Sequence, residues 1–216
     1  AKAARELGMR FMVHIGLPMP CIEDILDCLA PGDVVSHIYH GKINSPFQPD
    51  GQPIPALKRA LDRGVLMDVA HGLASFSFDV AEKAIAAGYP PFTISTDAHI
   101  LNINSNVFDL PTTMTKMCAI GMSLSDVIEA VTLSPAKVLQ QDGWCNLNGK
   151  LSNATLFTVS NSCPDWRKYK DMMGKEIPPE KHIIPEAVIT KQGIKWLDYY
   201  NRNVAEKLDN SLGLHP

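Results

Sequence analysis

The sequence lacks any run of about 18 consecutive apolar residues, and it does not open on the basic-then-apolar pattern of a secretory leader. We therefore expect no transmembrane helix and a cytoplasmic location. The sequence also lacks a block of Lys or Arg, and its formal net charge is only -3. Nucleic acid and anionic membrane surfaces are accordingly not expected as partners, whereas a small neutral or mildly charged substrate is.

Cysteine pairing is also absent. The five cysteines are odd in number and form no CxxC motif, which excludes a disulfide framework and a cysteine zinc site. A reducing compartment is the expected setting. With 45% hydrophobic and 20% charged residues, the 216 residues are sufficient for one good-sized globular core and a small appendage.

A unit of short apolar run, polar residue, loop and helical pattern recurs between Met9 and about Leu139. The apolar runs are rich in Val, Ile, Phe and Met and do not alternate strictly, which is typical of strands that are buried on both faces. The runs are RFMVH, DVVSH, VLMDVAH and FTISTD, and they end at His14, His37, His71 and Asp97.

Helical patterns fill the intervals between these predicted strands. The segments are CIEDILDCLA, IPALKRALDRG and DVAEKAIAAG, and the last two close on Gly64 and Gly88, which suit the left-handed residue after a helix. Successive strand ends are 23, 34 and 26 residues apart, which is about one βα unit each. Such alternation predicts a parallel sheet with right-handed crossovers, either a doubly wound open sheet or a (β/α)8 barrel.

Two more helices are predicted before the composition changes. GMSLSDVIEAVT has Ser123 and Asp126 at capping-box spacing, and SPAKVLQQ places Ser134 as N-cap with Pro135 at the first helical position. After about Gln141 the chain becomes rich in Gly, Asn, Pro and Lys. There we predict a small β appendage with a hairpin at EAVITKQGIKW and a C-terminal helix near YYNRNVAEKLDN.

The residues at the strand ends are the main functional signal. Side chains at the carboxyl ends of parallel strands converge on one face, and His and Asp are ligands of zinc and similar divalent ions. One such His is more often a core residue, but three in successive strands followed by Asp97 favour a metal site. A bound ion activates water, and a carboxylate beside that water can carry its proton to a leaving group.

Five segments in this order and spacing resemble the second half of the amidohydrolase superfamily barrel, in its dihydroorotase-like, deacetylase-type branch. They are MVHIG, GDVVSHIYHG, MDVAHGLASFSFDVAEKAIAAG, STDAH and TLSPAKVL, and the resemblance spans about residues 1–160. It implies an α/β fold in which residues 1–141 form strands five to eight of a (β/α)8 TIM-type barrel. Residues 142–216 then form the β appendage and C-terminal helix.

The resemblance also implies roles for individual residues. His14 and His37 would bind the second metal, Asp97 would bind the first metal and shuttle the proton, and His71 would contact substrate in the pocket. The cofactor would be a divalent metal, with zinc the first choice and two ions in the full-length protein. His40 and His99 follow predicted ligands closely, so each is either a substrate contact or a local hydrogen-bonding residue.

Two parts of the family pattern are missing. The strand-one HxH pair and the bridging strand-four lysine have no counterpart, and Lys2 lies in a predicted helix. The family's Ala-Asp-Leu segment is replaced by NATLFTV, which leaves the closing contact of the appendage open. We therefore expect this chain to be an inactive fragment of a longer chain, completed by an N-terminal segment or a second copy, with a homo-oligomer as the expected assembly.

The leading functional prediction is a metal-dependent hydrolase that cleaves an amide or ester bond in a small acylated molecule. Metal-activated water would attack, and Asp97 would be the proton shuttle. One alternative is a non-catalytic amidohydrolase homologue that serves as a structural or assembly subunit. Another is a fragment that binds one metal weakly through His14, His37 and Asp97.

Overall fold

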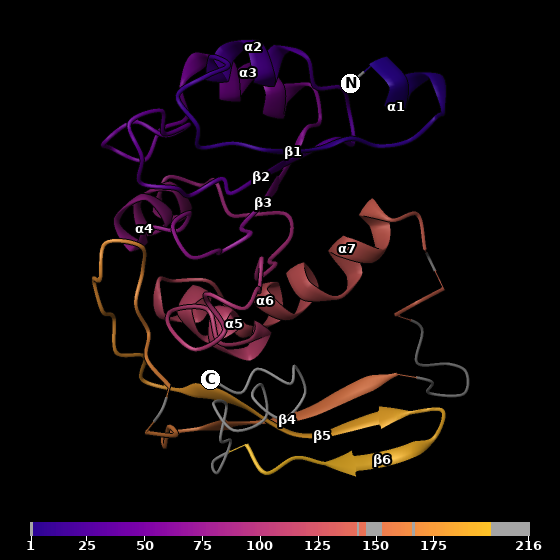
Figure 1. The fold of residues 1–216 in the computed structure, drawn as a ribbon, viewed down its shortest axis with the longest axis vertical. Coiled ribbons are helices and arrows are strands. Elements are labelled where there is room, and N and C mark those ends of the chain that lie inside the picture. The colour runs from indigo at the N-terminus through magenta and orange to yellow at the C-terminus, as the bar shows by residue number, and fades with distance from the viewer. Residues whose placement is uncertain (1, 142, 146–152, 166, 200–216) are drawn as a thin grey trace, which may run out of the picture.

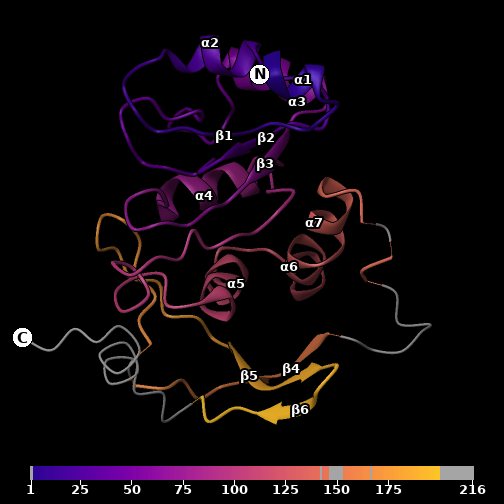
Figure 2. The same cartoon turned by 45° about the vertical axis from the view of Figure 1, so that its right-hand side comes forward.

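A computed structural model describes residues 2–141, 143–145, 153–165 and 167–199 (Figure 1). Two small sheets lie at different levels of the molecule, and helices α5, α6 and α7 lie between them (Figures 1 and 2). The elements are α1 (Lys2–Glu6), β1 (Met12–His14), α2 (Ile22–Asp27), β2 (Val34–Ser36), α3 (Pro55–Asp62), β3 (Leu66–Asp68), α4 (Phe78–Ala86), α5 (Leu110–Ala119), α6 (Leu124–Val131), α7 (Leu133–Val138), β4 (Ala154–Ser160), β5 (His182–Thr190) and β6 (Gly193–Trp196).

The first sheet is parallel and has the order β1-β2-β3. Helices α2 and α3 lie together on one side of it (Figure 1). All three residues of β2 are buried, as its Val-rich sequence predicts for a central strand of a parallel sheet. The first three predicted strands and the helices between them are therefore present, although β3 ends at Asp68, three residues before the predicted strand end at His71. The six strands of the described residues form two three-stranded sheets, and no closed eight-stranded barrel is present among these residues.

The fourth predicted strand, FTISTD, is wrong as a regular strand. Only an isolated parallel bridge joins Thr93 to Asp68, although the Val69 amide also donates to the Thr93 carbonyl at 3.1 Å. On the other side, the Ile94 amide donates to the carbonyl of Ala130 in α6 at 3.0 Å. The segment is thus extended beside β3, but a helix rather than a fifth strand satisfies its outer edge.

The helices predicted before Gln141 are confirmed, and one helix was not foreseen. Gly64 and Gly88 have φ of 93° and 92°, the left-handed conformation expected after α3 and α4. Ser123 caps α6 by accepting from the Asp126 amide at 3.1 Å. Helix α7 begins at Leu133, so Ser134 lies inside it and the predicted N-cap is wrong. None of the helices within the described residues has the length and hydrophobicity that a membrane span requires.

Helix α5 is the unforeseen element. Its N-cap is Asp109, whose carboxylate accepts from the Thr112 amide at 2.9 Å, and Pro111 occupies its first turn. An Asp with a Pro two residues later is a recognisable helix start. The helix body LPTTMTKMCA, however, carries threonines on buried positions and so lacks a clear apolar stripe.

The second sheet is antiparallel with the order β4-β5-β6. The hairpin predicted at EAVITKQGIKW is confirmed, since Thr190 pairs with Gly193 at the turn between β5 and β6. Ile183 of β5 belongs to the same hydrophobic core as the helices of the first part of the chain. The predicted C-terminal helix lies mostly in residues 200–216, which are outside the described residues.

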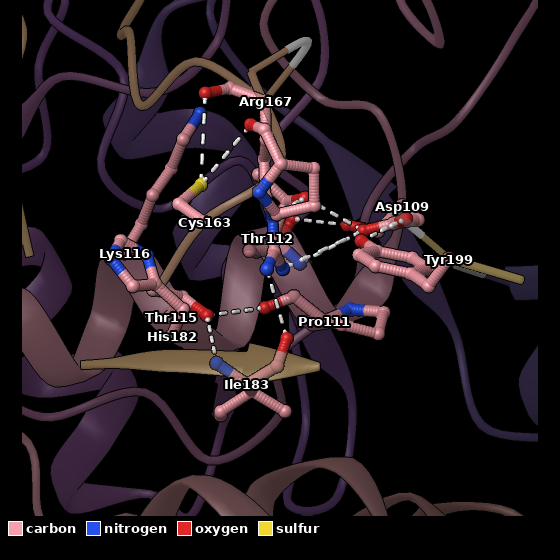
Figure 3. A network of polar contacts seen from close by, with 12 residues as sticks. Asp109, Pro111, Thr112, Thr115, Lys116, Cys163, Arg167, His182, Ile183 and Tyr199 are labelled. Atoms are coloured by element: carbon pink, nitrogen blue, oxygen red, sulfur yellow. Dashed lines mark hydrogen bonds and ion pairs between the residues drawn. The ribbon is translucent and has the colours of Figure 1, made fainter. Parts of the chain in front are cut away.

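A buried arginine joins helix α5 to strand β5 (Figure 3). The Arg167 side chain donates from Nε to Thr112 Oγ1 at 2.8 Å and from Nη1 to the Ile183 carbonyl at 2.9 Å. Its Nη2 lies 4.0 Å from Asp109 Oδ1, and Tyr199 donates to the other oxygen of that carboxylate at 2.6 Å. The guanidinium therefore links three segments that are distant in sequence.

We expect Arg167→Met to lower the free energy of unfolding by about 3–5 kcal/mol, because it removes the buried hydrogen bonds to Thr112 Oγ1 and the Ile183 carbonyl and the positive charge 4.0 Å from Asp109. Chemical denaturation measures this change. The control is Arg59→Met, which removes an ion pair to Asp27 whose side chains are 54% and 50% exposed. That loss should stay below about 1 kcal/mol. Equal losses in the two variants would refute the central role of Arg167.

Candidate metal centre and active site

The parallel sheet brings the three predicted metal ligands together. His14 ends β1, His37 follows the last residue of β2, and Asp97 ends the extended segment beside β3. His14 Nδ1 lies 2.8 Å from His37 Nε2, and His37 Nε2 lies 3.8 Å from Asp97 Oδ2. Two imidazole nitrogens and one carboxylate oxygen thus face one another at the edge where the strands end.

His37 is held in the tautomer that a metal ligand needs. Its Nδ1 hydrogen-bonds to the Ala70 carbonyl, which can only accept, so Nδ1 carries the proton and the Nε2 lone pair faces His14. The side chain is 3% exposed, and burial lowers the pKa of His37. The imidazole is consequently neutral at neutral pH, which is the form that coordinates a metal ion.

The backbone at two of these residues is in the left-handed region. The φ angles of His37 and Asp97 are 64° and 49°, which is uncommon for residues other than glycine. The Asn102 side chain is fully buried and donates from Nδ2 to the Asp97 carbonyl at 2.8 Å, while its Oδ1 accepts from the His99 amide at 2.8 Å. Such backbone strain concentrates at functional sites, where surrounding contacts hold it in place.

The donor set suits a divalent ion in type, and its spacing requires a small adjustment. Two nitrogens that bind one tetrahedral zinc ion at about 2.0–2.1 Å lie about 3.3 Å apart. His14 and His37 are closer than this, and across the described residues no group of three or more His, Cys, Asp or Glu side chains is arranged to hold a metal ion as it stands. Imidazole lone pairs and a carboxylate are nevertheless ligands that zinc accepts. The residues fit the ion after the two rings separate by about half an ångström.

His71 is placed differently from the other three. It is fully buried and stacks on Phe76 with ring centroids 4.5 Å apart. Its Nδ1 hydrogen-bonds to the Gly72 carbonyl at 2.9 Å, and its Nε2 contacts Lys116 Nζ at 2.8 Å. Both ring nitrogens therefore have protein partners, and this arrangement gives no support to His71 as a direct substrate contact.

His40 and His99, the weaker candidates, also differ from each other. His40 is fully buried; its Nδ1 accepts from the Lys42 amide at 3.3 Å, and its Nε2 has no hydrogen-bond partner within the described residues. Burial, with the nearby Lys42 charge, lowers the pKa of His40 to about 4. His99 is exposed, and its Nδ1 accepts from the Leu101 amide at 3.3 Å in a local turn.

Asp68 lies beside this site and was not singled out from the sequence. Its buried carboxylate accepts hydrogen bonds from the hydroxyls of Thr93 and Ser95, both at 2.7 Å, and from Ser36 at 3.4 Å. Burial raises the pKa of Asp68. The carboxylate therefore ties β2, β3 and the extended segment together just before their ends. The only sign of Asp68 in the sequence is that an acidic residue stands inside the otherwise apolar part of the VLMDVAH run.

Sequence comparison finds relatives that are all named deacetylases. No family model matches this chain. Deacetylase Atu3266 of Agrobacterium fabrum is 42% identical over 159 residues, which cover 73% of this chain and 39% of that protein. A deacetylase of Enterococcus faecalis is 39% identical over 180 residues, which cover 80% of this chain and 48% of the relative. The chain thus spans less than half the length of these curated relatives.

Structure comparison finds the same fold in two solved proteins. A dihydroorotase crystal structure matches with a TM-score of 0.84 and 34% identity, covering 94% of this chain and 52% of that one. An adenine deaminase matches with a TM-score of 0.78 and 29% identity, covering 91% and 54%. Both belong to the amidohydrolase superfamily, so the α/β fold described above is that of amidohydrolase barrel proteins.

The fold and the sequence relatives place this chain in the amidohydrolase superfamily. Within that superfamily, the chain groups by sequence with proteins named deacetylases. The resemblance predicted from the sequence is thereby confirmed.

The low pKa of His40 predicts a pH dependence of stability. The pKa falls from 6.5, its ordinary value, to about 4 on folding, so the unfolded chain binds the proton more tightly. Stability is then lost progressively as the pH falls from 6.5 toward 4, by up to about 3 kcal/mol. His40→Asn keeps an acceptor for the Lys42 amide and removes the titration. The measurement is the free energy of unfolding against pH.

The variant should show a flatter pH profile than the parent over this window. His99→Asn, which removes an exposed imidazole, is the control and should leave the profile unchanged. A parallel profile for His40→Asn and the parent would show that His40 is not held neutral by the fold.

Proposed function

We propose that the protein is a metal-dependent amidohydrolase that removes an acyl group from a small molecule by hydrolysis of an amide or ester bond. The proposal is supported by relatives that are named deacetylases. The observation that carries it is the convergence of His14, His37 and Asp97, two of them with left-handed backbone, at the end of the parallel sheet.

His14 Nδ1, His37 Nε2 and the Asp97 carboxylate are the groups that would hold a divalent ion, with zinc as the first choice and two ions in the full-length protein. Such an ion supplies a Lewis acid that polarises a carbonyl and lowers the pKa of water. The Asp97 side chain is 48% exposed, so its carboxylate can accept a proton from water and return it to a leaving group. The Ala70 carbonyl keeps the His37 lone pair directed toward the cluster.

Strand β1 is an edge strand of the parallel sheet. Large apolar side chains are exposed there, with Met12 55%, Leu17 63% and Met19 75% exposed. We propose that this chain forms strands five to eight of the barrel and that further polypeptide covers these side chains. That polypeptide would also supply the ligands missing from this chain, either from a preceding segment or from a second copy.

A non-catalytic structural homologue is the second candidate. The observation that favours it is the 2.8 Å contact between His14 and His37, in which the two predicted ligands satisfy each other. Metal analysis of the purified full-length protein after dialysis separates the candidates, because a scaffold has no need to retain zinc.

Asp97→Asn in the full-length protein should lower kcat by about 10²–10⁴-fold, because the amide cannot carry the proton to the leaving group. The assay is hydrolysis of a panel of N-acyl amino acids and O-acyl hydroxy acids. Asp62→Asn is the matched control, since Asp62 is an exposed carboxylate paired with Lys58 on α3. Unchanged turnover in Asp97→Asn would refute the proton-shuttle role, and a zinc-free, inactive parent protein would favour the scaffold.

Gly72 gives a second test of the same cluster. A Cβ at this position would lie 2.9 Å from Asp97 Oδ2 and 3.5 Å from His37 Cε1. We therefore expect Gly72→Ala to displace the Asp97 carboxylate and lower kcat by about 10-fold or more, since misplaced catalytic groups are costly. Steady-state kinetics of the full-length protein measures the change.

Gly88→Ala is the control for backbone strain. Gly88 also has a positive φ of 92°, but a Cβ there would meet nothing within 4 Å. Both variants should lose about 1 kcal/mol of stability from the left-handed backbone. Only Gly72→Ala should lose activity, and an equal loss in both would trace the effect to stability alone.

A further inference from the structure

Helix α5 carries a lysine that is buried inside the protein. Lys116 is 1% exposed, and burial lowers its pKa to about 7. Its Nζ contacts His71 Nε2 at 2.8 Å, donates to the Lys170 carbonyl at 2.6 Å and donates to the Asn106 carbonyl. An ammonium group has three donors, and here each has one acceptor. A buried lysine that is fully satisfied in this way is rare.

The three acceptors come from different parts of the chain. His71 lies in the turn after β3, Asn106 lies in the loop before α5, and Lys170 lies in the segment between β4 and β5. The Lys170 segment is fixed beside the site by its neighbours. Asp171 Oδ2 accepts from the amide of Phe78, the first residue of α4, at 3.0 Å, and the Met172 amide donates to the Phe76 carbonyl at 2.9 Å.

The turn formed by His71 and Gly72 is also connected to Asp97. The His71 amide donates to the Ser95 carbonyl at 3.1 Å, and the Gly72 amide donates to the Thr96 carbonyl at 3.0 Å. Gly72 also packs so closely on Asp97 that a Cβ would lie 2.9 Å from Oδ2. Two hydrogen bonds and one close contact thus connect the turn that carries His71 to the segment that ends at Asp97.

We infer that Lys116 is a positioning residue for the proposed hydrolysis: it holds the His71–Gly72 turn, and through that turn Asp97, in the reactive arrangement. The Lys170 carbonyl brings the β appendage into the same contact, so the appendage supports the site. This inference rests on the proposed function. It also gives His71 a role that agrees with its geometry, because the ring accepts from Lys116 and is closed to substrate.

The test uses the full-length protein and Lys116→Met, which keeps a long unbranched side chain and removes the donors. We expect kcat to fall by about 10- to 100-fold, with KM changed by less than about 3-fold, because the displaced group carries a proton and does not bind substrate. The matched control is Lys175→Met. Lys175 lies in the same segment as Lys170, is partly exposed and pairs with Asp79 of α4. Its kcat should stay within about 2-fold of the parent.

A double-mutant cycle tests the route through His71. His71→Phe retains a ring that can stack on Phe76 and removes the acceptor. If Lys116 acts through His71, the double variant Lys116→Met/His71→Phe should lose no more activity than the more damaged single variant. Additive losses would overturn the proposed route, as would a kcat for Lys116→Met equal to that of the parent.

A spectroscopic readout keeps this inference separate from the proposed function. In ¹⁵N-histidine-labelled protein, His71 should have the proton on Nδ1 and an Nε2 resonance that shifts in Lys116→Met. An unshifted resonance would overturn the inference without any activity assay. If the parent hydrolyses no substrate of the panel, the proposed function fails, while the Nε2 shift still decides whether Lys116 orders the turn.

Lys116→Gln is the second variant, and it separates the positioning role from a general loss of stability in Lys116→Met. Glutamine keeps two N–H donors on a shorter side chain, and its kcat should lie between those of the parent and the Met variant. A Gln variant that is folded and as impaired as Met, with the His71 resonance unshifted, would contradict the positioning role.

Discussion

The parallel register of β1, β2 and β3 is the constraint on which the candidate site depends. His14 pairs with Ser36, and Ser36 pairs with Asp68, so one polar residue from each strand lies in a single row across the sheet. His37 follows Ser36 directly and therefore projects beyond this row beside His14. A shift of one residue in the pairing would reverse the faces of these side chains and separate the imidazoles. The chemistry at the edge is thus a consequence of how the strands pair.

The pairing of the strands does not by itself direct the His37 and Asp97 side chains toward each other. Their backbone conformation does so. Both residues have positive φ, which is unfavourable for side chains with a Cβ. The opposing contacts are specific: the Ala70 carbonyl holds the His37 ring, and the Asn102 amide holds the Asp97 carbonyl. Both contacts lie within the protein and hold these residues in the left-handed region.

The sequence predicts the parts of the structure that depend on local pattern. The apolar runs ending at His14 and His37, the helix ends at Gly64 and Gly88, and the Ser123 cap all depend on neighbouring residues. The irregularity of the segment FTISTD was missed because its outer partner, the Ala130 carbonyl of α6, lies more than 30 residues further along the chain than Ile94. The positions of His71 and Lys116 were missed for the same reason. A lysine within a helical segment predicts an exposed side chain until the packing around it is known.

Helix α5 connects the β appendage to the ends of the parallel strands. Thr115 and Lys116 follow Thr112 by three and four residues, so each lies on the same side of the helix as Thr112. Arg167 and Ile183 bind the two threonines, while the Lys170 carbonyl binds the lysine. This polar face is buried against the appendage, whereas an ordinary amphipathic helix would expose it, and Lys116 continues it to the His71 turn. The contacts across the predicted boundary at residue 141 are therefore part of the support of Asp97. A change in the appendage can reach the carboxylate without touching a predicted ligand.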